Sequence, residues 1–111
     1  MRVYDHVGIP TTEERPDETY LEEFKVYVSG YETSEYGIEW MRFVPGSPVP
    51  DLVKTVPHVA FEVDDLEREL KGKTILIKPN SPSEGVMVAF IVENGAPVEF
   101  LTRLRPDAGT D

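Results

Sequence analysis

A short stretch near the middle of the chain, VPHVAFEVDDL at residues 56–66, decides the fold. Apolar residues alternate with other residues over 56–63, which predicts a strand. One of the two aspartates at the end of the stretch then caps a short helix that runs through Lys71. Because side chains alternate between the faces of a strand, His58 lies opposite the more apolar face.

This stretch has a counterpart at the N-terminus, where YDHVGI at residues 4–9 repeats its pattern of a histidine, a valine, a small residue and an apolar residue. A second pair follows in the same order, because GIEWM at residues 37–41 resembles PVEFL at residues 97–101. Three prolines fall between the two halves, within residues 45–50. The sequence therefore predicts an internal duplication.

Prolines and glycines divide the rest of the chain into short pieces, which indicates short strands rather than long helices. Asn94-Gly95 between two apolar runs is a strong hairpin signal. Residues 17–23 do not fit a strand or a helix clearly, and the acidic run 12–23 is either a solvated loop or a lid. We predict one domain over 1–104, with module 1 at about 1–45, a linker at 45–55, module 2 at about 56–104, and a flexible tail at 105–111. The expected strands are 2–9, 24–29, 37–44, 56–63, 74–77, 86–92 and 97–104, with a loop at 79–85.

Composition excludes several classes of function. The 111 residues carry a formal net charge of −10, which argues against nucleic acid and anionic membranes as partners. The absence of cysteine excludes disulfides, thiolate nucleophiles and zinc-thiolate sites. There is no apolar run of membrane-spanning length and no signal core, so we expect a cytoplasmic protein.

The repeat places chemically active side chains at equivalent positions. Each half has one histidine, His6 or His58, and one glutamate in the middle of an apolar strand, Glu39 or Glu99. A glutamate buried in a sheet is costly unless a charge or hydrogen bonds compensate it. Two imidazoles and two carboxylates converging on a concave sheet would hold a divalent metal ion such as Zn, Ni, Co, Mn or Fe.

The residues that share these faces are candidates for a substrate pocket. They are Tyr4, Met41, Phe43, Leu101 and Arg103. The alternative for the apolar members of this group is a plain hydrophobic core.

The order His, Glu, His, Glu across a duplicated unit resembles the vicinal oxygen chelate superfamily, which includes glyoxalase I, bleomycin-resistance proteins and ring-cleaving dioxygenases. The stretch 56–66 is similar to the strand and helix of that superfamily's second repeat, and GAPVEF at 95–100 is similar to its last strand. The resemblance implies an α+β fold, in which two βαβββ modules form a curved, partly open mixed sheet around a cavity. Because Pro16 interrupts the first module, its helix should be short or missing.

The resemblance also implies roles for individual residues. His6, Glu39, His58 and Glu99 match the four metal-ligand positions one by one. In glyoxalase-type members the metal holds two adjacent substrate oxygens while a glutamate carries the proton, a role for which Glu99 is the first choice and Glu39 the second. Relatives form dimers, so a homodimer is expected, with the four ligands coming from one chain or from two.

The preferred function is a metal-dependent lyase or isomerase of the glyoxalase type, acting on a small molecule with vicinal oxygens. Two alternatives stay open: a metal-free protein that sequesters a small molecule, as bleomycin-resistance proteins do, and an Fe(II)-dependent dioxygenase. Glutathione conjugates are disfavoured because the only candidate basic cluster consists of Arg42, Arg103 and Arg105. Methylmalonyl-CoA epimerases usually carry glutamine where Glu39 stands, which disfavours that activity.

Overall fold

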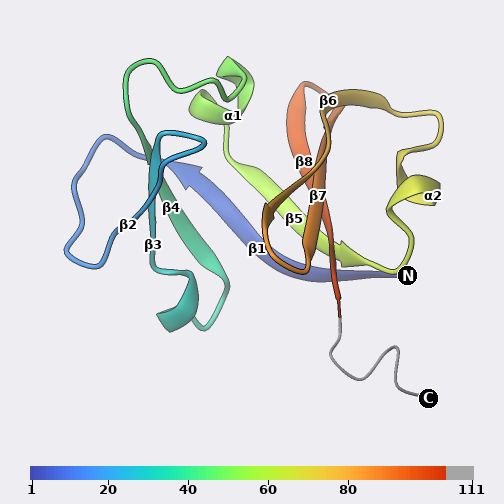
Figure 1. Cartoon of the computed structure of the whole chain (residues 1–111), viewed down its shortest axis with the longest axis horizontal. Helices are drawn as coiled ribbons and strands as arrows, with labels where there is room; N and C mark the ends of the chain where they lie inside the picture. The colour runs from blue at the N-terminus through green and yellow to red at the C-terminus, as the bar shows by residue number, and fades with distance from the viewer. Residues whose placement is uncertain (105–111) are drawn as a thin grey trace.

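The computed structural model describes residues 1–104, so the tail predicted for 105–111 lies outside the described residues. Eight strands form a single sheet in the order β2-β3-β4-β1-β5-β8-β7-β6 (Figure 1). The strands are β1 Arg2–Pro10, β2 Thr19–Leu21, β3 Val26–Ser29, β4 Ile38–Phe43, β5 His58–Val63, β6 Thr74–Ser83, β7 Val86–Glu93 and β8 Ala96–Arg103. The helical elements are η1 Tyr31–Thr33, α1 Asp51–Thr55 and α2 Leu66–Leu70.

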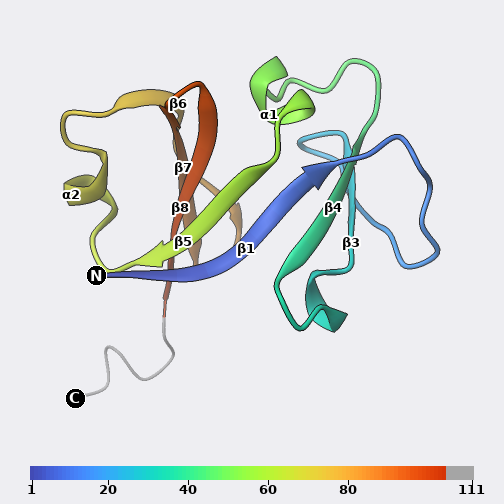
Figure 2. The ribbon, with the colours of Figure 1, turned by 180° about the vertical axis from the view of Figure 1, so that it is seen from behind.

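The sheet consists of two four-stranded halves with the same topology. In each half the first strand pairs in parallel with the last, β1 with β4 and β5 with β8, and the second and third strands continue outward from there. The halves join through the antiparallel pair β1 and β5, which cross the middle of the molecule in both views (Figures 1 and 2). The predicted glyoxalase-like fold of two modules in one mixed sheet is confirmed.

The two halves differ in the connection between their first and second strands. In the second half this connection contains α2, which Asp65 caps by accepting a hydrogen bond from the backbone N–H of Arg68 at 3.1 Å. Within residues 1–104 no helix joins β1 to β2. The first-module helix, predicted to be short or missing, is therefore missing between these two strands.

The missing helix changes how the outer face of each half is covered. In the second half, Leu66 and Leu70 of α2 pack on a buried cluster formed by Val63, Ile91 and Phe100.

In the first half, charged side chains lie against aromatic rings instead. The guanidinium of Arg15 lies 5.2 Å from the centre of the Trp40 ring, and that of Arg42 lies 4.3 Å from the Tyr27 ring. Arg42 also donates two hydrogen bonds of 2.7 Å to Glu18. The segment before β2 therefore covers part of the outer face of the first half, as α2 covers that of the second half.

Two local expectations differ from the structure, and a third stretch carried no clear expectation. The loop expected at 79–85 is mostly strand, because β6 continues through Pro79 and Pro82 to Ser83. This strand lies at the edge of the sheet, where a residue without an N–H is tolerated, and its pairing with β7 shifts register three times. The ambiguous stretch 17–23 contains the short strand β2. Within the expected linker, residues 51–55 form α1.

None of the helices in residues 1–104 has the length and apolar character needed to cross a membrane.

Candidate metal centre

The strand register brings the two halves of the candidate site together. Glu39 of β4 pairs with Gly8 of β1, and Glu99 of β8 pairs with Ala60 of β5. Gly8 and Ala60 each follow a histidine by two residues, so the same register occurs in both halves. Because β1 and β5 are neighbours, the two histidines and two glutamates meet at the middle of the sheet.

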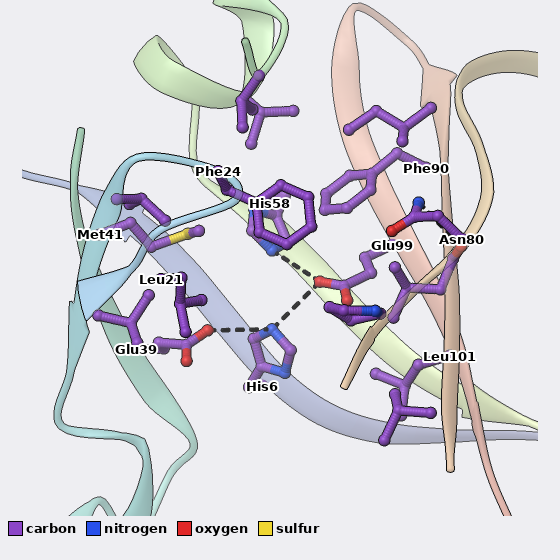
Figure 3. Close-up of a pocket in the computed structure, with 18 of the residues that line it drawn as sticks. His6, Leu21, Phe24, Glu39, Met41, His58, Asn80, Phe90, Glu99 and Leu101 are labelled. Atoms are coloured by element: carbon purple, nitrogen blue, oxygen red, sulfur yellow. Dashed lines mark hydrogen bonds and ion pairs between the residues drawn. The ribbon is translucent and has the colours of Figure 1, made fainter. Parts of the chain in front are cut away.

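Three of these side chains form a tight cluster. One ligand atom from each of His6, His58 and Glu99 lies within 4.8 Å of the other two, and all three residues are buried. Oε1 of Glu99 lies 3.0 Å from Nε2 of His58 and 3.3 Å from Nε2 of His6. Figure 3 shows the two imidazoles pointing at this carboxylate from β1 and β5. One chain therefore supplies the whole cluster.

Glu39 stands at the edge of this cluster. Its Oε1 lies 3.6 Å from Nε2 of His6, the contact drawn as a dashed line in Figure 3. Its side chain is 22% exposed, against 11% for Glu99. Glu39 thus faces the same space as the other three but is held by fewer contacts.

Asp5 orients the first histidine. Nδ1 of His6 donates a hydrogen bond to Oδ2 of Asp5 at 2.6 Å. Tyr31 donates to Oδ1 of the same carboxylate at 3.1 Å, and Arg103 donates to it at 2.9 Å. With Nδ1 committed to Asp5, Nε2 of His6 is the nitrogen that faces the two glutamates.

A break in strand alternation explains why the role of Asp5 was not predicted. Tyr4 pairs with Phe61 and His6 pairs with Ala60, so two steps along β1 match one step along β5 and Asp5 is the extra residue. Strict alternation would place Tyr4 beside His6 and Asp5 on the opposite face. At this bulge, Asp5 contacts the His6 ring instead.

Packing, rather than a second carboxylate at Nδ1, orients the ring of the second histidine, whose Nε2 faces Glu99. The residue before His58 is Pro57, which has no polar side chain, and within residues 1–104 the buried Nδ1 of His58 has no hydrogen-bond partner. The His58 ring contacts Phe90 edge-on, with centroids 4.9 Å apart. It also lies directly against Gly8, where an added Cβ would be 2.8 Å from Nε2. Gly8 therefore makes room for the histidine of the opposite half.

The electrostatics of the cluster favour a positive charge on His6, held among the neighbouring carboxylates. Burial alone lowers the pKa of His6, but the hydrogen bond and charge of Glu99, with Asp5 and Glu39, outweigh burial and raise it to about 9. Burial alone raises the pKa of Glu99, but hydrogen bonds from both histidines outweigh burial and lower it. Burial, to which the charge of Glu99 adds, keeps the pKa of Glu39 above its usual value. The cluster thus holds anionic oxygens around a cation, which is a proton when no metal is bound.

These residues fit a divalent metal ion. The cluster offers two imidazole nitrogens and a carboxylate, the donor types that zinc and neighbouring transition metals take. The His6 imidazole has, on its other nitrogen, the carboxylate partner that metal-binding histidines commonly have.

A cavity of about 230 Å³ opens over the cluster. Of the predicted pocket residues, Met41, Phe43, Leu101 and Arg103 line it. Tyr4 does not: it precedes the bulge, is 48% exposed and donates a hydrogen bond to the backbone oxygen of Tyr36 at 2.7 Å.

Further residues that the sequence did not single out also line the cavity. They include Leu21 at the end of β2, Phe24 between β2 and β3, and Ile77, Asn80 and Pro82 of β6. Leu21 lies in the stretch whose conformation was left open, and Asn80 and Pro82 lie where a loop was expected.

Comparison with known proteins supports the fold. No protein-family model matches the chain, and no curated protein sequence matches it. The hypothetical protein BH1468 from Bacillus halodurans C-125 superposes with a TM-score of 0.71 at 20% identity, covering 94% of this chain and 96% of that one. Methylmalonyl-CoA epimerase from Mycobacterium tuberculosis superposes with a TM-score of 0.63 at 18% identity, covering 98% of this chain and 92% of that one.

The topology and these likenesses together define the class: the chain has the fold of the vicinal oxygen chelate superfamily. Within that fold, it carries a buried His6-His58-Glu99 group of the kind that binds a divalent metal.

Proposed function

We propose that this protein is a metal-dependent isomerase or lyase of the glyoxalase type, acting on a small molecule with two vicinal oxygens. The observation that carries the proposal is the convergence of the His6, His58 and Glu99 donors beneath a cavity. The fold likeness to a methylmalonyl-CoA epimerase supports an isomerase in particular. A homodimer stays part of the proposal, although the cluster needs no second chain.

Nε2 of His6, Nε2 of His58 and the carboxylates of Glu99 and Glu39 would hold the ion. Zn, Ni, Co, Mn and Fe are all compatible with this donor set. When bound, such an ion polarises substrate oxygens and stabilises negative charge that develops on them.

The contacts favour Glu39 as the residue that carries the proton. Glu99 lies between two imidazoles at 3.0 and 3.3 Å, and movement of its carboxylate would break both contacts. Glu39 has one such contact, at 3.6 Å, and a more exposed side chain. It can therefore turn toward a substrate carbon, take a proton and return it while the other three side chains stay in place. This reverses the order of preference that the family resemblance implies.

The walls of the cavity favour one alternative, a metal-free protein that sequesters a small apolar molecule. Apolar side chains from both halves line most of the space. Such a protein has no chemical use for the buried cluster, so metal binding separates the two functions.

Metal loading tests the proposal directly. The protein is purified without chelator, stripped of metal and titrated calorimetrically with Zn²⁺, Co²⁺, Ni²⁺ and Mn²⁺. We expect one ion per chain, with affinity lowered more than about a hundredfold in His58→Ala and in Glu99→Gln. The exposed carboxylate variant Asp51→Asn is the matched control and should bind as the wild type does. Absence of a stoichiometric ion, or equal affinity in all variants, would overturn it.

A further inference from the structure

We propose that the compound bound in this cavity is small, uncharged and apolar in its body, and is not an anionic conjugate such as a coenzyme A or glutathione thioester. The inference rests on the proposed function, because it concerns what lies beside the metal cluster. It follows from three features: the apolar walls, the pairing of the Arg103 guanidinium, and the charge balance of the cluster.

The walls come from both halves of the chain. Leu21, Phe24 and Met41 belong to the first half, and Phe90 and Leu101 belong to the second (Figure 3). The volume of about 230 Å³ is below the roughly 300–1,000 Å³ of clefts that enclose drug-sized ligands. An anionic group placed against these walls loses its hydration without gaining a partner.

The described residues that line the cavity offer an anion no unmatched positive charge. Among the lining residues of the described chain, Arg103 is the only arginine or lysine. Its guanidinium donates to Asp5 at 2.9 Å and to Glu62 at 3.1 Å, so two carboxylates already face it. The amide nitrogen of Asn80 is also committed, because it donates to the backbone oxygen of Lys78 at 2.9 Å.

The cluster itself is electrically matched when an ion is bound. The two charges of a divalent cation equal those of the Glu39 and Glu99 carboxylates, so beyond the ligand's chelating oxygens the cluster offers no further positive charge to an anionic substituent. The formal net charge of −10 on the whole chain adds a long-range field that opposes the approach of anions.

Matched hydroxamic acids test this selectivity on the zinc-loaded protein by calorimetry. Benzohydroxamic acid presents two vicinal oxygens and an apolar ring, its 3- and 4-carboxy derivatives add an anion, and acetohydroxamic acid lacks the ring. We expect benzohydroxamic acid to bind at least about tenfold more tightly than the other three. Equal or tighter binding of either carboxy derivative, or of acetohydroxamic acid, would overturn the inference.

A charge introduced into the wall provides a second measurement. Met41→Lys should reduce the penalty on the carboxy derivatives at least about tenfold relative to Met41→Leu, which keeps the wall apolar. No difference between the two folded variants would contradict the role assigned to the walls.

The same scheme separates this inference from the proposed function. Metal loading is measured first. If no ion binds, the result contradicts the proposed metal-dependent function but not the inferred selectivity of the cavity. Selectivity is then measured on the metal-free protein with benzyl alcohol and benzoate by ligand-observed NMR, where equal or stronger binding of benzoate overturns the inference.

Discussion

Nδ1 of His6 donates a 2.6 Å hydrogen bond to the Asp5 carboxylate, whereas Nδ1 of His58 is buried without a partner in the described chain. The two histidines are equivalent in the repeat, so this asymmetry arises from the residue that precedes each one, aspartate in one half and proline in the other. Asp5 is itself held by Tyr31 of η1 and Arg103 of β8. The His6 imidazole is thus oriented by a network that joins both halves of the sheet.

Removal of this orienting carboxylate should weaken metal binding. We expect Asp5→Ala to lower the affinity for Zn²⁺ by about 10- to 100-fold, and Asp5→Asn by less, because an amide oxygen can still accept from Nδ1. Calorimetric titration measures the affinity. Glu62→Gln is the control, because Glu62 also accepts from Arg103, so its loss disturbs that arginine without removing Asp5. Equal effects of Asp5→Ala and Glu62→Gln would show that only the Arg103 network matters.

The two glutamates should separate metal binding from proton transfer. Glu99→Gln removes the carboxylate that both imidazoles face, so we expect loss of metal affinity by more than about a hundredfold. Glu39→Gln should retain a stoichiometric ion. It should also abolish exchange of the acidic C–H of a bound vicinal-oxygen ligand with deuterated solvent, followed by NMR. If exchange survives in Glu39→Gln while metal is bound, Glu99 regains the role of proton carrier.

Much of this site could be predicted from the sequence, because the repeat encodes it. A histidine, a small residue two positions later and a glutamate on another strand recur in both halves, and the register pairs Gly8 with Glu39 and Ala60 with Glu99. A duplicated pattern predicts the strand order of both halves of the sheet. The missing first helix is indicated by Pro16, which no helical pattern follows.

What could not be predicted depends on departures from strand periodicity. The bulge at Asp5 adds one residue to β1, which moves Tyr4 away from the cavity and brings Asp5 to the His6 ring. Nothing in the local composition marks this position, because the bulge is set by pairing with β5. Similarly, Pro79 and Pro82 are compatible with β6 only because that strand lies at the edge of the sheet. Both features follow from tertiary pairing that a single strand does not reveal.

The close packing of Gly8 against His58 gives a steric prediction. A Cβ at residue 8 would lie 2.8 Å from Nε2 and 2.9 Å from Nδ1 of a ring that is only 2% exposed. We therefore expect Gly8→Ala to destabilise the fold by about 1–3 kcal/mol and to lower metal affinity, because the ring must move. Thermal unfolding and calorimetry provide the two readouts.

Gly95→Ala is the matched control for this substitution. A Cβ at residue 95 meets no atom within 4 Å, but the backbone there has φ of +79°, so we expect a loss of about 1–2 kcal/mol from backbone strain alone. Metal affinity should stay at the wild-type value in Gly95→Ala. A similar loss of metal affinity in both variants would mean that general destabilisation, and not the contact with His58, is the cause.

The raised pKa of His6 predicts how stability depends on pH in the metal-free protein. The pKa is about 9 in the folded state against 6.5 for an unperturbed histidine, so between these values the folded state binds the extra proton. Stability from this group is therefore complete below about pH 6.5 and is lost as pH rises through 9, with a total loss on the order of 3 kcal/mol. Urea unfolding at a series of pH values measures it.

Two comparisons attribute that decline to His6. In His6→Gln the fall in unfolding free energy between about pH 6.5 and 9 should disappear, because the group that binds the extra proton is gone. With saturating Zn²⁺ the fall in unfolding free energy should also disappear, because the ion replaces the proton on Nε2 of His6. Affinity for the metal rises with pH, since that proton becomes easier to remove. A decline of equal size in the wild type and in His6→Gln would place the titrating group elsewhere in the chain.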